Sequence, residues 1–399
     1  MTLVLLDAAG RPLGALPPFE VSTPYWQDMR PVVAGARERY GVEVAVLRLL
    51  SAQRPEPHGG AVTYLAQTDA DPPAGLTTPV EVDLSPDPHR APYAEPGGPA
   101  ASLRWAGEAL HAFGRGPIQA AAQDRTWNLS AIWALRTSGG PVWLKQVPRF
   151  FAHESAVLRW IAGLGYGHLV PRVLAAAEPP QPPGCILLDH VDGNDLYGAG
   201  LDVRIAIVAD LHPVQRAAAD PVEELLRLGV PDRRTAPLIA ALRGVVARHG
   251  GGDRRLDALA AGLDERMARV AACGLPETLL HGDLHPGNVR GHIGATGPDG
   301  RPRVVIDWGD SCVTHPAFDV LRMTEGLAEG DARAVVDAWA APWRAGGGDP
   351  EGAVELLRPV AALRNAAAYA DFLDQIEPAE HPYHAADVGL WLNRAAELV

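Results

Sequence analysis

The segment His281-Gly282-Asp283-Leu284-His285-Pro286-Gly287-Asn288 places a carboxylate and a carboxamide five positions apart, with a histidine two positions before the carboxylate. Nineteen residues after Asn288 comes Asp307-Trp308-Gly309, at the end of an apolar run, Arg303 to Ile306, that predicts a strand. A few hard oxygen ligands suit Mg²⁺, which keeps water and phosphate oxygens as its other ligands. The two segments together predict a magnesium site held by Asn288 and Asp307.

Protein kinases use the same spacing in their catalytic loop, where the aspartate receives the proton of the substrate hydroxyl. The spacing therefore predicts that Asp283 orients and deprotonates an acceptor hydroxyl. We expect His281 to hold the shape of the loop through a hydrogen bond to backbone near Asp307, rather than to act as a base. A turn or capping role is the ordinary alternative for Asp283 and Asn288. It is disfavoured because the two residues occur in register with Asp307.

The nucleotide side of the predicted site rests on residues upstream. Lys145 ends an apolar strand and is expected to reach the α- and β-phosphates, with Glu154 in the next helix as its ion-pair partner. A surface lysine and an unrelated glutamate are the ordinary alternative. Neither a G-x-G-x-x-G nor a G-x-x-x-x-G-K-[ST] loop occurs, so backbone N–H groups and Ser130 are expected to cradle the phosphates. Adenine is expected to bind the Asp189 carbonyl and the Val191 amide.

The HGDLHPGN segment together with IDWGDSCVTHPAFD resembles the aminoglycoside phosphotransferase and choline kinase family, within the protein-kinase-like superfamily, over about residues 100–399. The resemblance implies an α+β, bilobal protein-kinase-like fold with a small β-rich N-lobe and a larger helical C-lobe. It implies that Asp283 is the catalytic base, that Asn288 and Asp307 hold metal, and that Asp319 braces the catalytic loop. The stretch TWNLSAIWALRTSGGPVWLKQVPRFFAHE resembles the N-lobe of the family and supports Lys145 and Glu154.

The same resemblance bears on the substrate. Gly282 replaces the arginine of the protein-kinase HRD motif, and no APE segment follows, so a small-molecule acceptor is favoured over a protein. We expect ATP and Mg²⁺ as cofactors, with GTP left open as the donor. The expected acceptor is a hydroxyl of an aminoglycoside, amino sugar or related amine or polyol. Four acids near the C-terminus are candidates for a cationic subsite: Asp371, Asp374, Glu377 and Glu380.

Domain boundaries are drawn from composition and periodicity. Residues 1–90 predict a small α/β domain that resembles the Nudix fold, although only Glu38 stands near a metal position of the Nudix box. A Pro/Gly/Ala-rich linker is expected over 91–101, the N-lobe over 102–190 and the helical C-lobe over 191–399. Helices are expected over 25–40, 103–113, 151–164, 203–211, 237–248 and 255–273, and strands over 3–6, 42–50, 61–66, 80–84, 130–137, 141–147, 173–177 and 185–190. A glycine-rich hairpin tip is expected over 291–300, and breaks in the C-terminal helices at prolines 342, 350 and 378.

Bulk properties exclude several classes. The 399 residues carry a formal charge of −13, from 35 basic and 48 acidic side chains, which argues against a nucleic-acid partner. Three scattered cysteines without a CxxC argue against a disulfide framework. Neither a signal peptide nor an apolar run of about 20 residues, the length of a membrane span, is found, so we expect a cytoplasmic protein. The oligomeric state cannot be inferred from the sequence.

Two other functions are left open. His281, Asp283 and His285 alternate, so on a strand they would share one face and could bind zinc or iron as a metal-dependent hydrolase. Pro286-Gly287 forces a turn directly afterwards, and a hydrolase leaves Asn288 without a role. The second alternative is a non-catalytic ATP-binding interaction protein, against which the complete set of predicted kinase residues counts.

Overall fold

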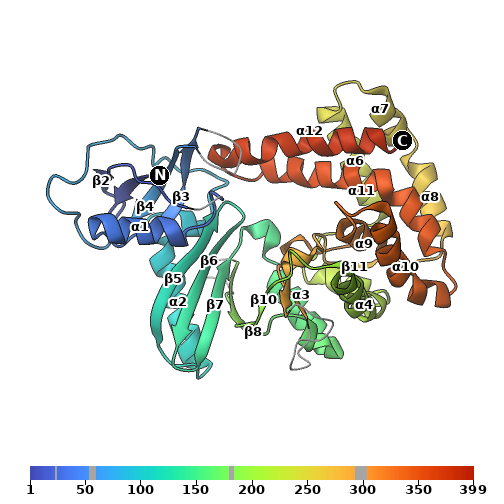
Figure 1. Ribbon diagram of the computed structural model, residues 1–399, viewed down its shortest axis with the longest axis horizontal. Coiled ribbons are helices and arrows are strands. Elements are labelled where there is room, and N and C mark those ends of the chain that lie inside the picture. Colours follow the sequence, from blue (N-terminus) through green and yellow to red (C-terminus); the bar gives the residue numbers. More distant parts are fainter. Residues whose placement is uncertain (23–24, 54–59, 179–183, 293–302) are drawn as a thin grey trace. The chain divides into compact units, whose positions relative to one another are not determined.

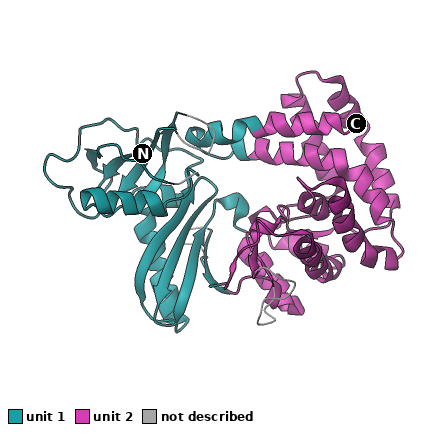
Figure 2. Cartoon of the chain, in the orientation of Figure 1, with its two compact units in different colours: residues 1–152, 173–190, 372–386 teal, residues 153–172, 191–371, 387–399 magenta. Residues whose placement is uncertain are grey.

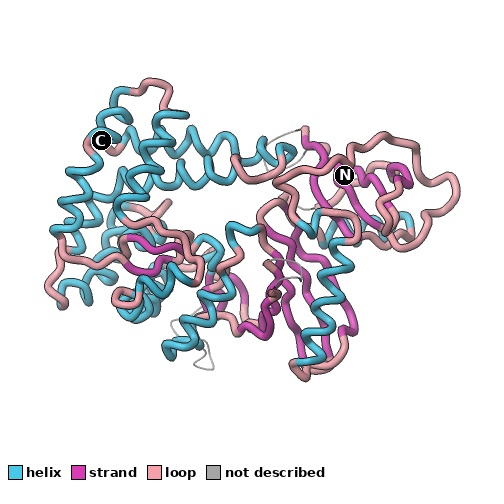
Figure 3. Tube along the Cα trace, turned by 180° about the vertical axis from the view of Figure 1, so that it is seen from behind, coloured by secondary structure: helices cyan, strands magenta, loops and turns pink. Residues whose placement is uncertain are grey.

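The computed structural model describes residues 1–22, 25–53, 60–178, 184–292 and 303–399. The chain divides into two compact units (Figure 2). The strand-rich unit comprises residues 1–152, 173–190 and 372–386, and the helical unit comprises residues 153–172, 191–371 and 387–399. Strands dominate the first and helices the second (Figures 1 and 3), so the predicted α+β class is confirmed. The predicted boundaries at 90, 101 and 190 stay predictions.

The strand-rich unit begins with a four-stranded sheet in the order β2-β1-β4-β3, in which β1 and β4 run parallel. Its strands are β1 (Thr2–Leu6), β2 (Pro12–Ala15), β3 (Ala45–Ala52) and β4 (Val62–Gln67). Helix α1 (Arg30–Tyr40) has a proline in its first turn and ends at Gly41 in the left-handed conformation, the usual helix stop. Its buried Val32 and Ala36 pack with Leu3 and Leu5 of β1 in one apolar cluster.

A second, five-stranded antiparallel sheet follows, in the order β5-β6-β7-β9-β8. Its strands are β5 (Ile118–Trp127), β6 (Ser130–Thr137), β7 (Gly140–Gln146), β8 (Val173–Ala176) and β9 (Cys185–Asp189). Helix α2 (Gly98–Ala112) contributes Trp105 and Leu110 to a cluster with Leu144 and Leu187 of the sheet. Burying such side chains stabilises the fold by about 1.5–3 kcal/mol each.

One buried glutamine ties the two sheets together. The Gln123 carboxamide on β5 accepts from the Val46 N–H of β3 at 2.8 Å and donates to the Val46 carbonyl at 2.7 Å. A side chain thereby occupies the place of a peptide group along β3, and both of these backbone groups are satisfied. The first sheet is therefore joined to the second by directed contacts.

The helical unit holds the segment in which the sequence analysis placed its catalytic residues. Its helices, in whole or in part, are α3 (Glu154–Ile161), α4 (Leu201–Ala218), α5 (Val222–Arg227), α6 (Thr235–His249), α7 (Arg254–Ala261), α8 (Leu263–Ala272), α9 (Ala317–Met323), α10 (Glu329–Ala345), α11 (Pro350–Leu373) and α12 (His381–Glu397). Two small antiparallel sheets are formed by β10 (Asn194–Asp195), β12 (Val289–Gly291) and β13 (Val304–Val305), and by β11 (Thr278–Leu280) and β14 (Cys312–Thr314). Among the helices described, none is long and apolar enough to span a membrane.

Several predicted elements are wrong in place or extent. Residues 80–84 form no strand; Thr78 instead pairs with Ala15 as an isolated bridge, and Val80 is 40% exposed without a partner strand. The helix expected over 25–40 begins only at Arg30. Strand β5 was missed because its alternation is weak: four consecutive residues from Gln119 are exposed. In the expected linker, α2 already begins at Gly98 and Tyr93 is buried.

The remaining predicted elements differ less from the structure. The helix expected over 255–273 is two helices, because the chain breaks at Gly262 between α7 and α8. Pro342 lies inside α10 instead of ending it, whereas Pro350 begins α11 as expected. The helix expected over 151–164 is regular only as α3, after a 3₁₀ turn at Arg149–Phe151. The expected hairpin tip over 291–300 falls largely outside the described residues.

Candidate active site

The catalytic segment begins where β11 ends and leads through a 3₁₀ turn, Pro286–Asn288, into β12. Gly282 has φ of 91°, and a Cβ built on it would lie 2.1 Å from the Asp310 carbonyl oxygen. An L side chain would meet both backbone strain and a collision with backbone at this position. The glycine that replaces the protein-kinase arginine is therefore required by the path of this chain.

Asp319 fixes the first two residues of the segment. Its side chain is 1% exposed, and its two carboxylate oxygens accept from the backbone N–H groups of His281 at 3.0 Å and Gly282 at 3.1 Å. The Gln215 carboxamide on α4 donates a third bond at 3.1 Å. Burial raises the pKa of Asp319 above its ordinary value, although these bonds and nearby positive charge oppose the rise. These contacts are those expected of a residue that braces the loop.

His281 is buried and uses both ring nitrogens for structure. Nε2 lies 2.9 Å from the Ile306 carbonyl oxygen, and Nδ1 accepts from the Asp283 N–H at 3.3 Å. The ring packs edge-on against Trp308 at 4.8 Å. The expected bond to the backbone just before Asp307 is present, and the same bonds leave the ring no nitrogen for metal binding.

Asn288 turns its amide nitrogen toward Asp283. Nδ2 donates to the Asp283 carbonyl oxygen at 3.0 Å and to Oδ2 of its carboxylate at 3.1 Å. The amide oxygen consequently points away from these partners, and no described residue donates to it. This arrangement leaves the kind of neutral oxygen ligand that a magnesium ion takes.

Asp307 follows β13 in a conformation that only this non-glycine residue adopts among those described, with φ of 64° and ψ of 61°. A left-handed aspartate costs about 1–3 kcal/mol and persists where its surroundings fix it. The next residue supplies that restraint: Trp308 is buried, its indole donates to the Val305 carbonyl at 3.0 Å, and its N–H donates to Glu154 at 3.2 Å. Backbone strain is therefore concentrated at the predicted metal ligand.

Arg322 on α9 was not predicted from the sequence. Its Nε donates to Asp283 Oδ1 at 2.7 Å, and its Nη1 pairs with Glu325. A signal was available, because Arg322 stands three positions after Asp319 and such residues share one face of a helix. Burial favours the neutral form of Asp283, but a bond from His285 and the charge of Arg322 outweigh it, so the pKa of Asp283 lies well below its ordinary value.

Other predicted residues lie in the strand-rich unit. Lys145 is buried on β7, and Asp189 at the end of β9 pairs through its carboxylate with Arg115 at 2.5 Å. The chain passes into the helical unit between His190 and Val191. Because Lys145 and Glu154 belong to different units, their ion pair stays a prediction.

The turn between β5 and β6, residues 127–130, differs from the expected phosphate cradle. Both carboxylate oxygens of Glu380 accept from the Asn128 N–H, each at 3.1 Å, and Asn128 Oδ1 accepts from the Glu377 N–H at 3.2 Å. Ser130 Oγ accepts from the Trp127 indole at 2.8 Å. Burial raises the pKa of Glu380 to about 7, against the lowering effect of the Asn128 bond. The groups expected to meet phosphate are bonded within the unit.

The acids expected to line a cationic subsite do not gather in one place. Asp371 lies in the helical unit and pairs with Arg233 at 2.8 Å. The other three lie in the strand-rich unit, where Glu377 pairs with Arg90 at 2.8 Å and Glu380 holds Asn128. The subsite built from all four acids is therefore not supported.

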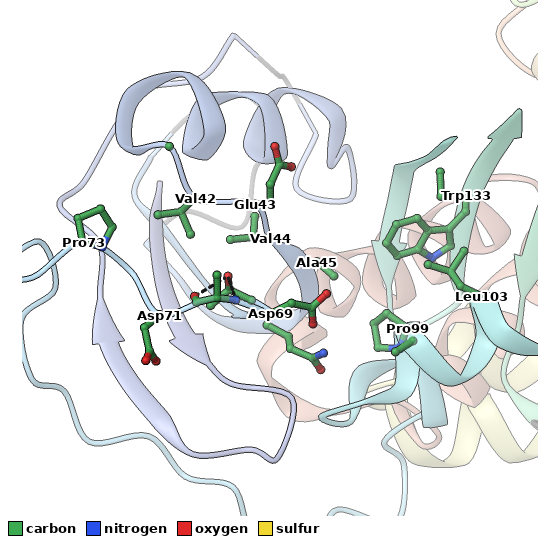
Figure 4. Close-up of a pocket in the computed structure, with 16 residues that line it drawn as sticks. Val42, Glu43, Val44, Ala45, Asp69, Asp71, Pro73, Pro99, Leu103 and Trp133 are labelled. Atoms are coloured by element: carbon green, nitrogen blue, oxygen red, sulfur yellow. Dashed lines mark hydrogen bonds between the residues drawn. The ribbon is translucent and has the colours of Figure 1, made fainter. Parts of the chain in front are cut away.

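The strand-rich unit also contains a cavity of about 340 Å³ (Figure 4). The carboxylates of Glu43, Asp69 and Asp71 lie on one side of it, and Trp133, Leu103 and Pro99 on the other. Two of these carboxylates already have arginine partners, Glu43 with Arg37 and Asp71 with Arg11. None of the predicted site residues lines this cavity.

No set of three or more histidine, cysteine, aspartate or glutamate side chains in the described part of the chain is placed to hold a metal ion. Together with the bonds of His281, this disfavours the predicted alternative of a hydrolase built on residues 281, 283 and 285. A magnesium site of the kinase kind uses fewer protein ligands and an asparagine oxygen.

Comparisons with known proteins identify the family. A family model described as "Phosphotransferase enzyme family" matches residues 125–363. No curated protein matches the chain. Among solved structures, the GDP and kanamycin complex of APH(2")-IIia has a TM-score of 0.53 at 17% identity, covering 74% of this chain and 99% of that one. Choline kinase LicA from Streptococcus pneumoniae has a TM-score of 0.53 at 12% identity, with coverage of 74% and 98%.

These structural likenesses confirm the predicted kinase-like fold. The family match stops short of residues 1–90, so the resemblance to the Nudix fold finds no support. It covers more than half of the chain, including both motifs, and confirms the predicted kinase-type enzyme. The chain belongs to the phosphotransferase enzyme family.

Proposed function

We propose that this phosphotransferase transfers the γ-phosphoryl group of ATP, in the presence of Mg²⁺, to a hydroxyl of a small molecule. The observation that carries the proposal is the arrangement of Asp283 and Asn288 on one loop, which Asp319 holds by two backbone bonds. GTP stays an alternative donor, because a solved structure of the same fold is a GDP complex. Aminoglycosides, amino sugars and related amines or polyols are the acceptor classes considered.

Asp283 is assigned the role of binding and deprotonating the acceptor hydroxyl. Its carboxylate is held ionised by Arg322 and His285, so it can accept a hydrogen bond from the hydroxyl and take the proton as the oxygen attacks. The new O–P bond forms while the bond between the γ-phosphorus and the bridging oxygen breaks, and ADP leaves with the electron pair. A base with a low pKa acts mainly by orienting the hydroxyl until late in the transfer, which suits a loose transition state.

Asn288 and Asp307 are assigned the role of magnesium ligands. Asn288 fits because its amide nitrogen is engaged by Asp283, which leaves its oxygen for the ion. Asp307 fits because the chain fixes a carboxylate in a strained conformation at the end of β13. When bound, the ion neutralises charge on the phosphate oxygens. Lys145 is assigned to the α- and β-phosphates with Glu154 as its ion-pair partner, and the Asp189 carbonyl and the Val191 amide are assigned to adenine.

The test is ADP release from ATP and Mg²⁺ across a panel of amino sugars, aminoglycosides, polyols and peptides. We expect at least one small hydroxyl compound to be phosphorylated, and Asp283→Asn to lower kcat about 10²- to 10⁴-fold, the usual contribution of a general base. Asp337→Asn, an exposed aspartate on α10, is the matched control and should behave as wild type.

Turnover on peptides alone would reject the small-molecule assignment. Nucleotide binding without turnover on any acceptor would favour the non-catalytic alternative. A tightly bound transition metal together with hydrolysis that needs no ATP would favour the hydrolase.

A further inference from the structure

We propose that Arg322 selects the acceptor, by binding an oxygen next to the hydroxyl that Asp283 receives. This inference rests on the proposed function and narrows it. It favours vicinal diols, sugars and α-hydroxy acids over compounds that carry an ammonium group beside the reacting hydroxyl.

The guanidinium of Arg322 is fixed from two sides. Nε donates to Asp283 Oδ1 at 2.7 Å, and Nη1 pairs with Glu325, which in turn accepts from the Asn365 amide at 3.3 Å. These contacts reach from the catalytic loop through α9 to α11. A planar guanidinium held at two nitrogens has its third nitrogen fixed in direction as well.

That third nitrogen is available to a ligand. Nη2 of Arg322 has no hydrogen-bond partner within the described ranges. The side chains of Arg322 and Asp283 are 30% and 34% exposed, so the ion pair is open on one side. An ion pair with only a structural purpose gives no reason for an unused donor beside the catalytic carboxylate. A molecule that places a hydroxyl on Asp283 would therefore bring its neighbouring substituent to Arg322.

The donors around Asp283 favour oxygen at that position. Arg322 is shared by two carboxylates, Asp283 and Glu325, so the selection rests on its directed Nη2 donor and not on an excess of positive charge. A second arginine, the partly buried Arg364, donates to the Gly282 carbonyl at 3.3 Å. An ammonium group has no lone pair with which to accept from Nη2, whereas a hydroxyl or carboxylate oxygen would gain a charge-assisted hydrogen bond.

Matched acceptor pairs test the inference. The pairs are glucose with glucosamine and glycerol with 2-amino-1,3-propanediol, and D-glycerate is added as an α-hydroxy acid. The readout is kcat/KM from ADP release at saturating ATP and Mg²⁺. In wild type we expect the ammonium member of each pair to be at least tenfold poorer. Arg322→Gln should reduce that ratio at least tenfold, mostly through KM, and Arg322→Lys should restore much of it because a charged donor returns.

Two controls separate selection from folding. Arg333→Gln, an exposed arginine on α10, should keep the wild-type ratio. Unchanged thermal melting and unchanged ATP–Mg²⁺ affinity should accompany the altered ratio in Arg322→Gln. If that variant does not fold, the wild-type preference decides, since it needs no substitution.

A wild-type preference for the ammonium members, or a ratio that Arg322→Gln leaves unchanged, would overturn the role of Arg322 while leaving the phosphotransferase assignment standing. ADP release with none of these compounds nor with any other member of the acceptor panel is a different result. It would overturn the proposed function, and this inference with it.

Discussion

The catalytic loop, residues 281–288, and the β5–β6 turn, residues 127–130, are two polar loops with opposite uses of their polar groups. In the loop, backbone N–H groups are held by buried Asp319, and the amide oxygen of Asn288 stays available. In the turn, Asn128 is bonded at both its backbone N–H and its side chain, and Ser130 Oγ is bonded to Trp127. The first arrangement fixes the backbone and leaves side chains for ligands; the second uses both within the unit.

The difference indicates which of the two loops has polar groups available to a ligand. The loop depends on one buried carboxylate that accepts from the N–H groups of His281 and Gly282, so the Asp283 carboxylate and the Asn288 amide oxygen are not used for this purpose. The turn depends on a carboxylate from far along the chain, and a nucleotide phosphate that approached the Asn128 N–H would have to displace Glu380. The comparison predicts that removing Asp319 damages activity and stability together, whereas changing Glu380 alters how stability depends on pH.

Removing the carboxylate of Asp319 should have the largest effect on stability. Asp319→Ala leaves two buried backbone N–H groups without partners and should destabilise the protein by about 3–5 kcal/mol, measured by urea denaturation. Activity should fall with it, because residues 281–283 lose their restraint. A variant that retains full activity and stability would show that the loop does not depend on Asp319.

The contact between Glu380 and the β5–β6 turn should make the stability of the protein depend on pH. Burial raises the pKa of Glu380 from 4.5 to about 7, so its contribution to stability is complete below pH 4.5 and is lost as the pH rises to about 7. At 1.36 kcal/mol per pH unit this amounts to about 3 kcal/mol. Glu380→Gln, which can still accept from the Asn128 N–H, should lack this loss.

The readout is the difference in unfolding free energy between wild type and Glu380→Gln at pH 4.5 and pH 7.5. Taking the difference cancels other groups, among them His384, whose pKa burial lowers to about 4 and which therefore favours folding as the pH rises. A difference that is the same at both pH values would contradict the account of the turn.

Straining the backbone of the catalytic loop should lower stability less than removing the Asp319 carboxylate that holds it. Gly282→Ala would place a Cβ against the Asp310 carbonyl and an alanine in a backbone conformation with positive φ. It should lower the free energy of unfolding by about 1–3 kcal/mol. Thermal melting and kcat measure the two consequences. Gly330→Ala on α10, where a Cβ would meet open space, is the matched control and should be neutral or stabilising. Equal effects of the two substitutions would argue against a strained loop.

Local spacing predicted that Asp283 and Asn288 lie together and that His281 bonds to backbone near Asp307, and the structure shows both contacts. The catalytic role of the loop stays a prediction. The brace at Asp319 came from the family resemblance rather than from spacing. Arg322 was within reach of helical periodicity but was not linked to Asp283. Glu380 could not be found in this way, since 252 positions separate it from Asn128 and no pattern connects them. Strand β5 escaped because four consecutive residues from Gln119 are exposed, so its first half shows no alternation.

The central claim is that Asp307 and Asn288 bind the magnesium ion that accompanies the nucleotide. Isothermal titration calorimetry with a non-hydrolysable ATP analogue, in Mg²⁺ and then in EDTA, measures this directly. The account predicts that wild type and the Asp337→Asn control bind the analogue at least tenfold more tightly with Mg²⁺, and that Asp307→Asn loses this difference. An Asp307→Asn variant with the full wild-type dependence on Mg²⁺ would contradict it.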